Sequence, residues 1–344
     1  MTAAGPSPAR TCVSCGTELP PAFLACPSCG KLVNTEALKA LAAEAAAATR
    51  SGDARAALAK WREALALLPP GSGQHTRVLE TVQKLSAQVD AATSAASGAA
   101  PVPPKKRGKL YAAVAAGGAL LLKFKYVVLF LLGKGKLLLV GLFQAKTMLT
   151  MVLATGVYAG AHGWKFAVGL IVSIYVHEMG HVERLRHYGI PASAPMFVPG
   201  LGAFVRLKQH PATAREDARV GLAGPIWGAV AAVAFLVAGR LTHHAGAVAV
   251  GRVGAWINLF NLIPVWQLDG GRAFNALSRR QRVLAAVLLW LLALMQIDGM
   301  LFLLALGASY RAWSKTEPQE GDRGAFALYA GLVVGLTAIV VVGK

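Results

Sequence analysis

Acidic residues are scarce in this sequence, and charged residues of either sign are fewer than a soluble protein usually carries. Of 344 residues, 16 are Asp or Glu and 35 are Lys or Arg, so charged residues make up 15% of the chain. Soluble domains average about 25%. The hydrophobic fraction is 55% and the mean hydropathy is +0.51. These values exclude an ordinary soluble enzyme, and the long apolar stretches after residue 110 predict an integral membrane protein.

The shortage of acidic residues persists where the chain is most apolar. Residues 110–344 contain 22 Lys and Arg but 9 Asp and Glu, and the basic residues cluster in short loops. In a basic soluble protein this excess would suggest nucleic acid as a partner. In a membrane protein it is typical of cytoplasmic loops, which attract anionic lipid head groups. We therefore expect the lipid bilayer, and not nucleic acid, as the partner of this region.

The first residues, MTAAGPSPARTC, lack the apolar core of a signal peptide. We therefore expect the N-terminal part to remain in the cytoplasm. The apolar part is expected in the cytoplasmic membrane, which is the inner membrane if the chain is bacterial. Cysteine is absent after residue 29, so every cysteine lies in the part that would stay reduced.

The cysteines form two C-x-x-C-G motifs, at Cys12 and Cys15 and at Cys26 and Cys29. Four thiolates at this spacing can surround Zn²⁺ as a tetrahedron, and the glycines permit the tight turns that this requires. Two disulfides or a redox C-x-x-C are the alternatives, which a reduced compartment disfavours. We predict a small zinc ribbon over residues 1–34 that holds one structural zinc.

Residues 35–90 are rich in alanine and read as helical, with a break at Gly52-Asp53. The second helix has the spacing of a tetratricopeptide repeat at Ala57, Trp61, Ala64 and Pro69. A plain helical hairpin explains the pattern equally well. Either module would offer a surface to a protein partner and carries no chemistry. Residues 91–109 form a Pro-containing basic linker, and residues 110–344 form the predicted transmembrane domain.

Apolar stretches long enough to span a bilayer follow the linker. A span needs about 20 apolar residues. The candidates are 137–160, 164–186, 219–240, 247–268, 283–307 and 324–342. Residues 110–132 are ambiguous because two lysines interrupt them. The predicted fold is an all-α polytopic membrane protein of about six transmembrane helices, preceded by the zinc ribbon and the helical module.

One predicted span contains the sequence HEMGH, residues 177–181. His177 and His181 are four residues apart, so they share one face of a helix, and Glu178 lies beside them. H-E-x-x-H is typical of zinc metalloproteases, in which the histidines bind the metal and the glutamate is the general base. A pair of core histidines is the structural alternative, but it leaves the charge of Glu178 inside an apolar span unexplained.

A catalytic zinc needs a third protein ligand, and no acidic residue lies between positions 184 and 215. Two acidic residues in later apolar stretches are candidates, Asp269 and Asp298. Asp269 is favoured because it precedes two glycines at a helix break. It also lies close to Arg272, as the HEMGH motif lies close to Arg184. Basic ends of spans are typically cytoplasmic, so we expect the active site to open toward the cytoplasm.

The pairing of HEMGH with NLIPVWQLDGGR resembles the site-2 protease family of intramembrane zinc metalloproteases. The resemblance covers about residues 164–285 and includes the stretches FVPGLGAFVRL and GLAGPIWGA. It implies a catalytic zinc bound by His177, His181 and Asp269, with Glu178 as general base. It also implies that Asn261 donates a hydrogen bond to substrate or oxyanion. The implied activity is regulated intramembrane proteolysis of transmembrane protein substrates.

The stretch FVPGLGAFVRL, residues 197–207, predicts a short re-entrant β-hairpin around Gly200 and Gly202. Its open edge could bind an unwound substrate strand by β-augmentation, as the resemblance also implies. A plain loop with glycine turns is the alternative.

Two other functions fit parts of the pattern. A membrane protease of a different zinc class would need a glutamate as third ligand, and the sequence offers none at a suitable place. A non-catalytic membrane scaffold or receptor could use the ribbon and the helical module for protein binding, but it would not need Glu178.

Overall fold

The computed structural model describes residues 10–20, 22–97, 145–198, 202–204, 209–296, 298–314, 318 and 321–343. The chain divides into two compact units. The first comprises Met1–Ala100 with His187–Ile190, and the second comprises Pro101–Arg186 with Pro191–Lys344. The predicted stretches 110–132 and 137–144 lie outside the described residues.

The first unit begins with a small cysteine-containing sheet. Strands β1 (Arg10–Thr11) and β2 (Glu18–Leu19) pair antiparallel. Each C-x-x-C-G motif closes a turn in which the glycine N–H donates to the carbonyl of the first cysteine, at 2.8 Å in both motifs. Gly16 and Gly30 have φ values of 72° and 71°, which residues with a Cβ rarely adopt. The glycines therefore permit the turns that bring the thiols together.

Three helices complete this unit: α1 (Thr35–Arg50), α2 (Ala54–Ala66) and α3 (Gly73–Ser97). The break between α1 and α2 lies at Gly52-Asp53, where the Asp53 carboxylate caps α2 by accepting the N–H of Ala56. Small alanine side chains let the helices pack closely, and Ala45, Ala57 and Leu58 are fully buried. The first residues of the predicted linker, 91–97, belong to α3.

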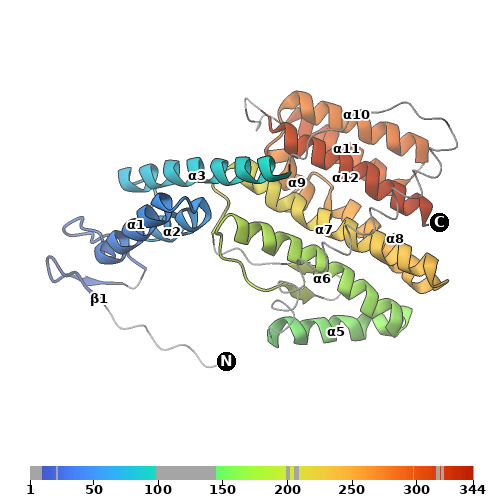
Figure 1. The fold of residues 1–344 in the computed structure, drawn as a ribbon, viewed down its shortest axis with the longest axis horizontal. Coiled ribbons are helices and arrows are strands. Elements are labelled where there is room, and N and C mark those ends of the chain that lie inside the picture. The colour runs from blue at the N-terminus through green and yellow to red at the C-terminus, as the bar shows by residue number, and fades with distance from the viewer. Residues whose placement is uncertain are drawn as a thin grey trace. The chain divides into compact units, whose positions relative to one another are not determined.

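The second unit contains helices α5 to α12 and one hairpin (Figure 1). Its first part comprises α5 (Ala145–His162), α6 (Trp164–His187), β3 (Met196–Val198), β4 (Gly202–Phe204), α7 (Ala214–Leu241) and α8 (Ala245–Asn261). Its second part comprises α9 (Asp269–Asn275), α10 (Arg279–Gln296), α11 (Gly299–Trp313) and α12 (Arg323–Val342). Helices α7 and α8 pack as a hairpin, and so do α10 and α11. The largest core lies among α7, α8, α9, α10, α11 and α12.

The prediction of a mostly helical protein is confirmed, and the prediction of a hairpin is confirmed by β3 and β4. These strands pair antiparallel with Phe197 opposite Ala203. Gly202 begins β4, whereas Gly200 lies outside the described residues. Two described helices, α7 and α12, are long enough and contain an apolar stretch of 18 residues, as a membrane span requires.

The prediction of one span over 283–307 is wrong. The stretch contains two helices, because α10 ends at Gln296 and α11 begins at Gly299. The Asp298 carboxylate caps α11 by accepting the N–H groups of Met300 and Leu301, at 2.9 and 3.4 Å. Asp298, the second candidate for a metal ligand, therefore has a structural role as an N-cap.

We predict that Asp298→Ala lowers the free energy of unfolding by about 1 kcal/mol, because a helix N-cap is lost. The zinc content of the purified protein should stay unchanged, as elemental analysis would measure. Loss of zinc from this variant would instead show that Asp298 contributes to a metal site.

Candidate metal centre

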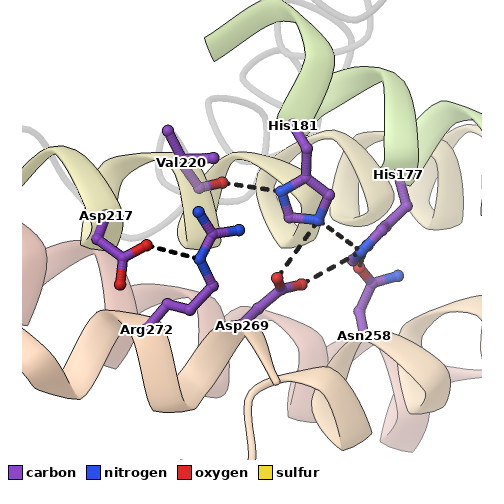
Figure 2. A network of polar contacts seen from close by, with 7 residues as sticks. All are labelled: His177, His181, Asp217, Val220, Asn258, Asp269 and Arg272. Carbon is purple, nitrogen blue, oxygen red and sulfur yellow. Dashed lines mark hydrogen bonds and ion pairs between the residues drawn. The ribbon is translucent and has the colours of Figure 1, made fainter. Parts of the chain in front are cut away.

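Helices α6 and α9 bring together three side chains of metal-binding type (Figure 2). His177 and His181 lie one turn apart on the same face of α6, and Asp269 is the first residue of α9. The two Nε2 atoms are 3.2 Å apart. Asp269 Oδ2 lies 3.2 Å from Nε2 of His177, and Oδ1 lies 3.3 Å from Nε2 of His181. The structure thus places together the three residues that the sequence predicted as ligands.

The spacing of these atoms fits a zinc ion. Zinc–nitrogen and zinc–oxygen bonds of about 2.0–2.1 Å in a tetrahedron put neighbouring ligand atoms about 3.3–3.4 Å apart. The three measured separations are close to this value. The three residues are buried, with exposed fractions of 4% for His177, 7% for His181 and 8% for Asp269. Three protein ligands leave a fourth position for water or substrate, which is typical of catalytic zinc and not of structural zinc.

The second nitrogen of each imidazole is held by a hydrogen bond. His181 Nδ1 donates to the carbonyl of Val220 on α7, at 2.8 Å. His177 Nδ1 lies 2.8 Å from Oδ1 of Asn258 on α8. Asn258 Nδ2 donates to the carbonyl of Gly254 at 2.7 Å, so its oxygen is the atom that accepts from His177. Both Nδ1 atoms therefore carry hydrogen, and both Nε2 lone pairs are available to a metal.

Helix α7 approaches the imidazoles through glycine. A Cβ atom at Gly224 would overlap His181 Nε2 and would lie 2.7 Å from His177 Nε2. A Cβ atom at Gly228 would overlap the carboxamide of Asn258. On α6, a Cβ atom at Gly180 would meet the backbone carbonyl of Ala223. The GLAGPIWG stretch, noted in the sequence for its family resemblance, is thus the surface that α7 presents to the site.

Two contacts hold the helix that carries Asp269. In its middle, Arg272 Nε donates to Asp217 Oδ1 on α7 at 2.8 Å, as Figure 2 shows. Near its C-terminal end, the buried Arg282 donates from Nε and Nη2 to the carbonyl of Phe274, at 3.2 and 3.0 Å. These contacts hold α9 against its neighbours, so the position of the Asp269 carboxylate is set by the fold.

Glu178 follows His177 on α6 and is also buried, with 6% of its surface exposed. Its carboxylate has no hydrogen-bond partner among the residues that the structure describes. It is therefore available to a water molecule or a substrate amide in the same region.

The structure puts Asn258 beside the ligands, a residue that was not predicted from the sequence. Asn261, three positions later in INLFNLIP, was predicted in a different role, as a donor to substrate or oxyanion. Asn261 is the last residue of α8 and is partly exposed. Asn258 is buried and faces α6. The signal that could have found it is Gly254, four residues earlier, which marks the close-packed face of α8.

The four cysteines form a second cluster of metal-binding groups. Sγ of Cys12 lies 3.7 Å from that of Cys29, and Sγ of Cys15 lies 3.5 Å from that of Cys26. A zinc tetrahedron with bonds of about 2.3 Å has edges of about 3.8 Å, so the cluster fits a structural zinc. Hydrogen bonds from the hydroxyl and backbone N–H of Thr17 lower the pKa of the Cys15 thiol to about 6, which favours the thiolate that a metal needs.

Comparison with known proteins agrees with this geometry. Residues 165–250, which include the HEMGH motif, match the description Peptidase family M50. This part of the chain is therefore similar to peptidase family M50. The match confirms the family predicted from the sequence. It ends before Asp269, so the assignment of the third ligand rests on the distances above.

A curated protein similar to part of this chain is a zinc metalloprotease of Methanocaldococcus jannaschii. It is 24% identical over 117 residues, which are 33% of this chain and 34% of the relative. The alignment thus spans about a third of the length of the curated relative. No solved structure matches the chain.

We predict that Gly224→Ala prevents metal binding at the site of His177, His181 and Asp269. The added methyl group would occupy the space of the ligand nitrogens, so zinc should fall by about one ion per chain on elemental analysis. Gly331→Ala on α12 is the matched control, because a Cβ there has open space. Full zinc content in the Gly224 variant would contradict the proposed position of the metal.

Asn258→Ala should weaken zinc binding at the membrane site by about 10- to 100-fold, because His177 loses the partner that orients it. Competition with a chelator measures the affinity, and the visible spectrum of the cobalt-substituted protein reports the ligand geometry. Asn258→Asp keeps an acceptor and should restore much of the affinity, whereas Asn261→Ala should leave it unchanged. An Asn258→Ala variant that is less stable but binds zinc normally would limit Asn258 to a packing role.

Proposed function

We propose that this protein is an intramembrane zinc metalloprotease, which hydrolyses peptide bonds in or near transmembrane segments of other membrane proteins. The observation that carries the proposal is the set of three ligand residues whose facing atoms lie 3.2–3.3 Å apart, with Glu178 next to His177 in sequence. The M50 match and the zinc metalloprotease relative support the same chemistry.

Each residue of the site would have its own role in the hydrolysis. His177, His181 and Asp269 would hold the zinc, which when bound supplies a Lewis acid that activates water and polarises a carbonyl. Glu178 accepts a proton from the attacking water and returns it to the leaving amine when the C–N bond breaks. Asn258 and the carbonyl of Val220 keep the imidazoles in the tautomer that presents Nε2.

The proposed substrate is a transmembrane helix that has partly unwound. In an intact helix each carbonyl accepts a hydrogen bond from within the same helix, so it is closed to attack. An unwound segment has free backbone groups, which an exposed strand edge can pair. The β3–β4 hairpin offers such an edge, and we propose that it binds the segment. Asn261 is our proposed hydrogen-bond donor to the substrate.

The contacts of α5 indicate which edge of the hairpin is open. Thr150 Oγ1 accepts the N–H of Phe197 at 3.2 Å, and Thr147 Oγ1 donates to the carbonyl of Pro195 at 2.8 Å. Side chains of α5 thus occupy the outer edge of β3. Ala203, opposite Phe197, has its N–H and C=O directed away from β3, because backbone groups alternate along a strand. The segment would therefore pair with β4, which begins at Gly202.

The cytoplasm is the proposed side from which water and substrate reach the site. Arg184 follows His181 on α6, and Arg272 follows Asp269 on α9, and basic residues favour the cytoplasmic side. The zinc ribbon and helical module would lie on this side and recruit a protein partner. The alternative function is a scaffold or receptor that uses the same N-terminal module without cleavage.

Reconstitution with single-span membrane proteins tests the proposal. We predict that the wild type cleaves a subset of them and that Glu178→Gln lowers the rate by at least about 100-fold while zinc stays bound, since general-base catalysis contributes about 10²–10⁴. Glu183→Gln, the same change five residues later on α6, is the control and should keep activity. Equal cleavage by wild type and Glu178→Gln would refute the catalytic role, and zinc binding without cleavage of any substrate would favour the scaffold.

A further inference from the structure

The turn between α8 and α9 holds a tryptophan in an unusual backbone conformation. Trp266 has a φ of 48°, and His243 is the other non-glycine residue with positive φ in the described part of the chain. Leu268 N–H donates to the carbonyl of Val265 at 3.3 Å, so Trp266 occupies the second position of a tight turn. Positive φ at this position favours glycine, asparagine or aspartate. A bulky side chain there costs about 1–2 kcal/mol.

The residues around Trp266 hold the turn in place. Leu262 and Ile263 before it belong to the buried core. Tyr329 of α12 donates its hydroxyl hydrogen to the carbonyl of Leu262 at 2.9 Å. After the turn, a Cβ atom at Gly271 would lie 2.6 Å from the carbonyl oxygen of Trp266. The residues before and after the turn thus contact buried neighbours, which hold the backbone of the turn in this conformation.

Burial of the indole does not offset this strain. The Trp266 side chain is 88% exposed, although Val265 and Leu268 on either side pack against the core. Strained residues that persist where the surrounding structure determines their conformation concentrate at functional sites. Trp266 also lies three residues before Asp269, so the turn that leads into the metal ligand also sets the backbone position from which the indole projects.

We propose that Trp266 is a specificity-determining residue that contacts the substrate segment beside the zinc site. This inference rests on the proposed function. An unwound membrane segment presents apolar side chains and carbonyls without partners. An indole offers a rigid apolar face and one N–H donor, which suit both features.

Contact with lipid alone would not require the strained turn. Trp313 on α11 is 81% exposed and Trp164 on α6 is 66% exposed, and neither has a positive φ. Exposed tryptophans in this chain are therefore accommodated without strain where no fixed position is needed. At position 266 the strained turn instead sets the backbone position from which the indole projects.

The test compares Trp266→Gly with the wild type in the full-length, zinc-loaded protein. Glycine relieves the strain and removes the indole, so the melting temperature should be unchanged or higher and the zinc content equal. The kcat/KM for cleavage of a single-span substrate should fall by about tenfold or more, as for loss of an aromatic contact in an interface. Trp266→Phe should lose less. Trp313→Ala is the matched control and should cleave like the wild type.

Three results would overturn the inference. Normal cleavage by Trp266→Gly would show that the indole does not contact the substrate. Loss of zinc from this variant would show that the turn serves only to position Asp269. A defect in liposomes that disappears in detergent micelles would assign the indole to the lipid interface. If the wild type cleaves no substrate, the proposed function fails, and binding of a single-span peptide to wild type and Trp266→Gly still tests the contact separately.

Discussion

The close contact between α7 and the two imidazoles of α6 is the constraint on which the site depends. Val220 accepts the Nδ1 hydrogen of His181, and one turn later Gly224 leaves the space in which the Nε2 atoms meet. A larger residue at Gly224 would separate α7 from the ligands, and a larger residue at Gly228 would separate it from Asn258. Helices that pack in a membrane commonly use small residues in this way, because close approach of the backbones permits hydrogen bonds between helices.

This contact also reduces the free-energy cost of burying polar groups at the site. A polar group buried without a partner costs about 1–3 kcal/mol, and the site contains imidazoles, a carboxylate and a carboxamide in an apolar surrounding. The structure pairs the Nδ1 atoms of the imidazoles with Val220 and Asn258. The two Nε2 atoms and the Asp269 carboxylate, which are the potential metal ligands, face one another. A metal ion at their meeting point would satisfy those atoms as well. The same arrangement keeps α9 in place, because Asp217 on α7 pairs with Arg272, one turn after Asp269.

The sequence predicted the features of the site that are local. HEMGH places two histidines on one helical face by periodicity alone. The helix break expected near Asp269 exists, but it lies before Asp269, and the two glycines after it belong to α9. The sequence did not single out Asn258, because its contact with His177 depends on how α8 lies against α6 and not on a local motif. The sequence also predicted one span where the structure has α10 and α11. Both helices are apolar, and hydropathy alone does not reveal the N-cap that begins α11. The pair Asp298-Gly299 carried that signal. The exposure of Trp266 could not be predicted either, since it depends on the conformation of the turn.

Zinc K-edge absorption of a full-length variant with all four cysteines replaced by serine tests the central claim most directly. This variant removes the sulfur site and leaves the proposed site of His177, His181 and Asp269. The account predicts that about one zinc ion per chain remains, bound by nitrogen and oxygen at about 2.0–2.1 Å with the scattering pattern of two imidazoles. A folded variant that binds no zinc, or one whose spectrum requires fewer than two imidazoles, would contradict it.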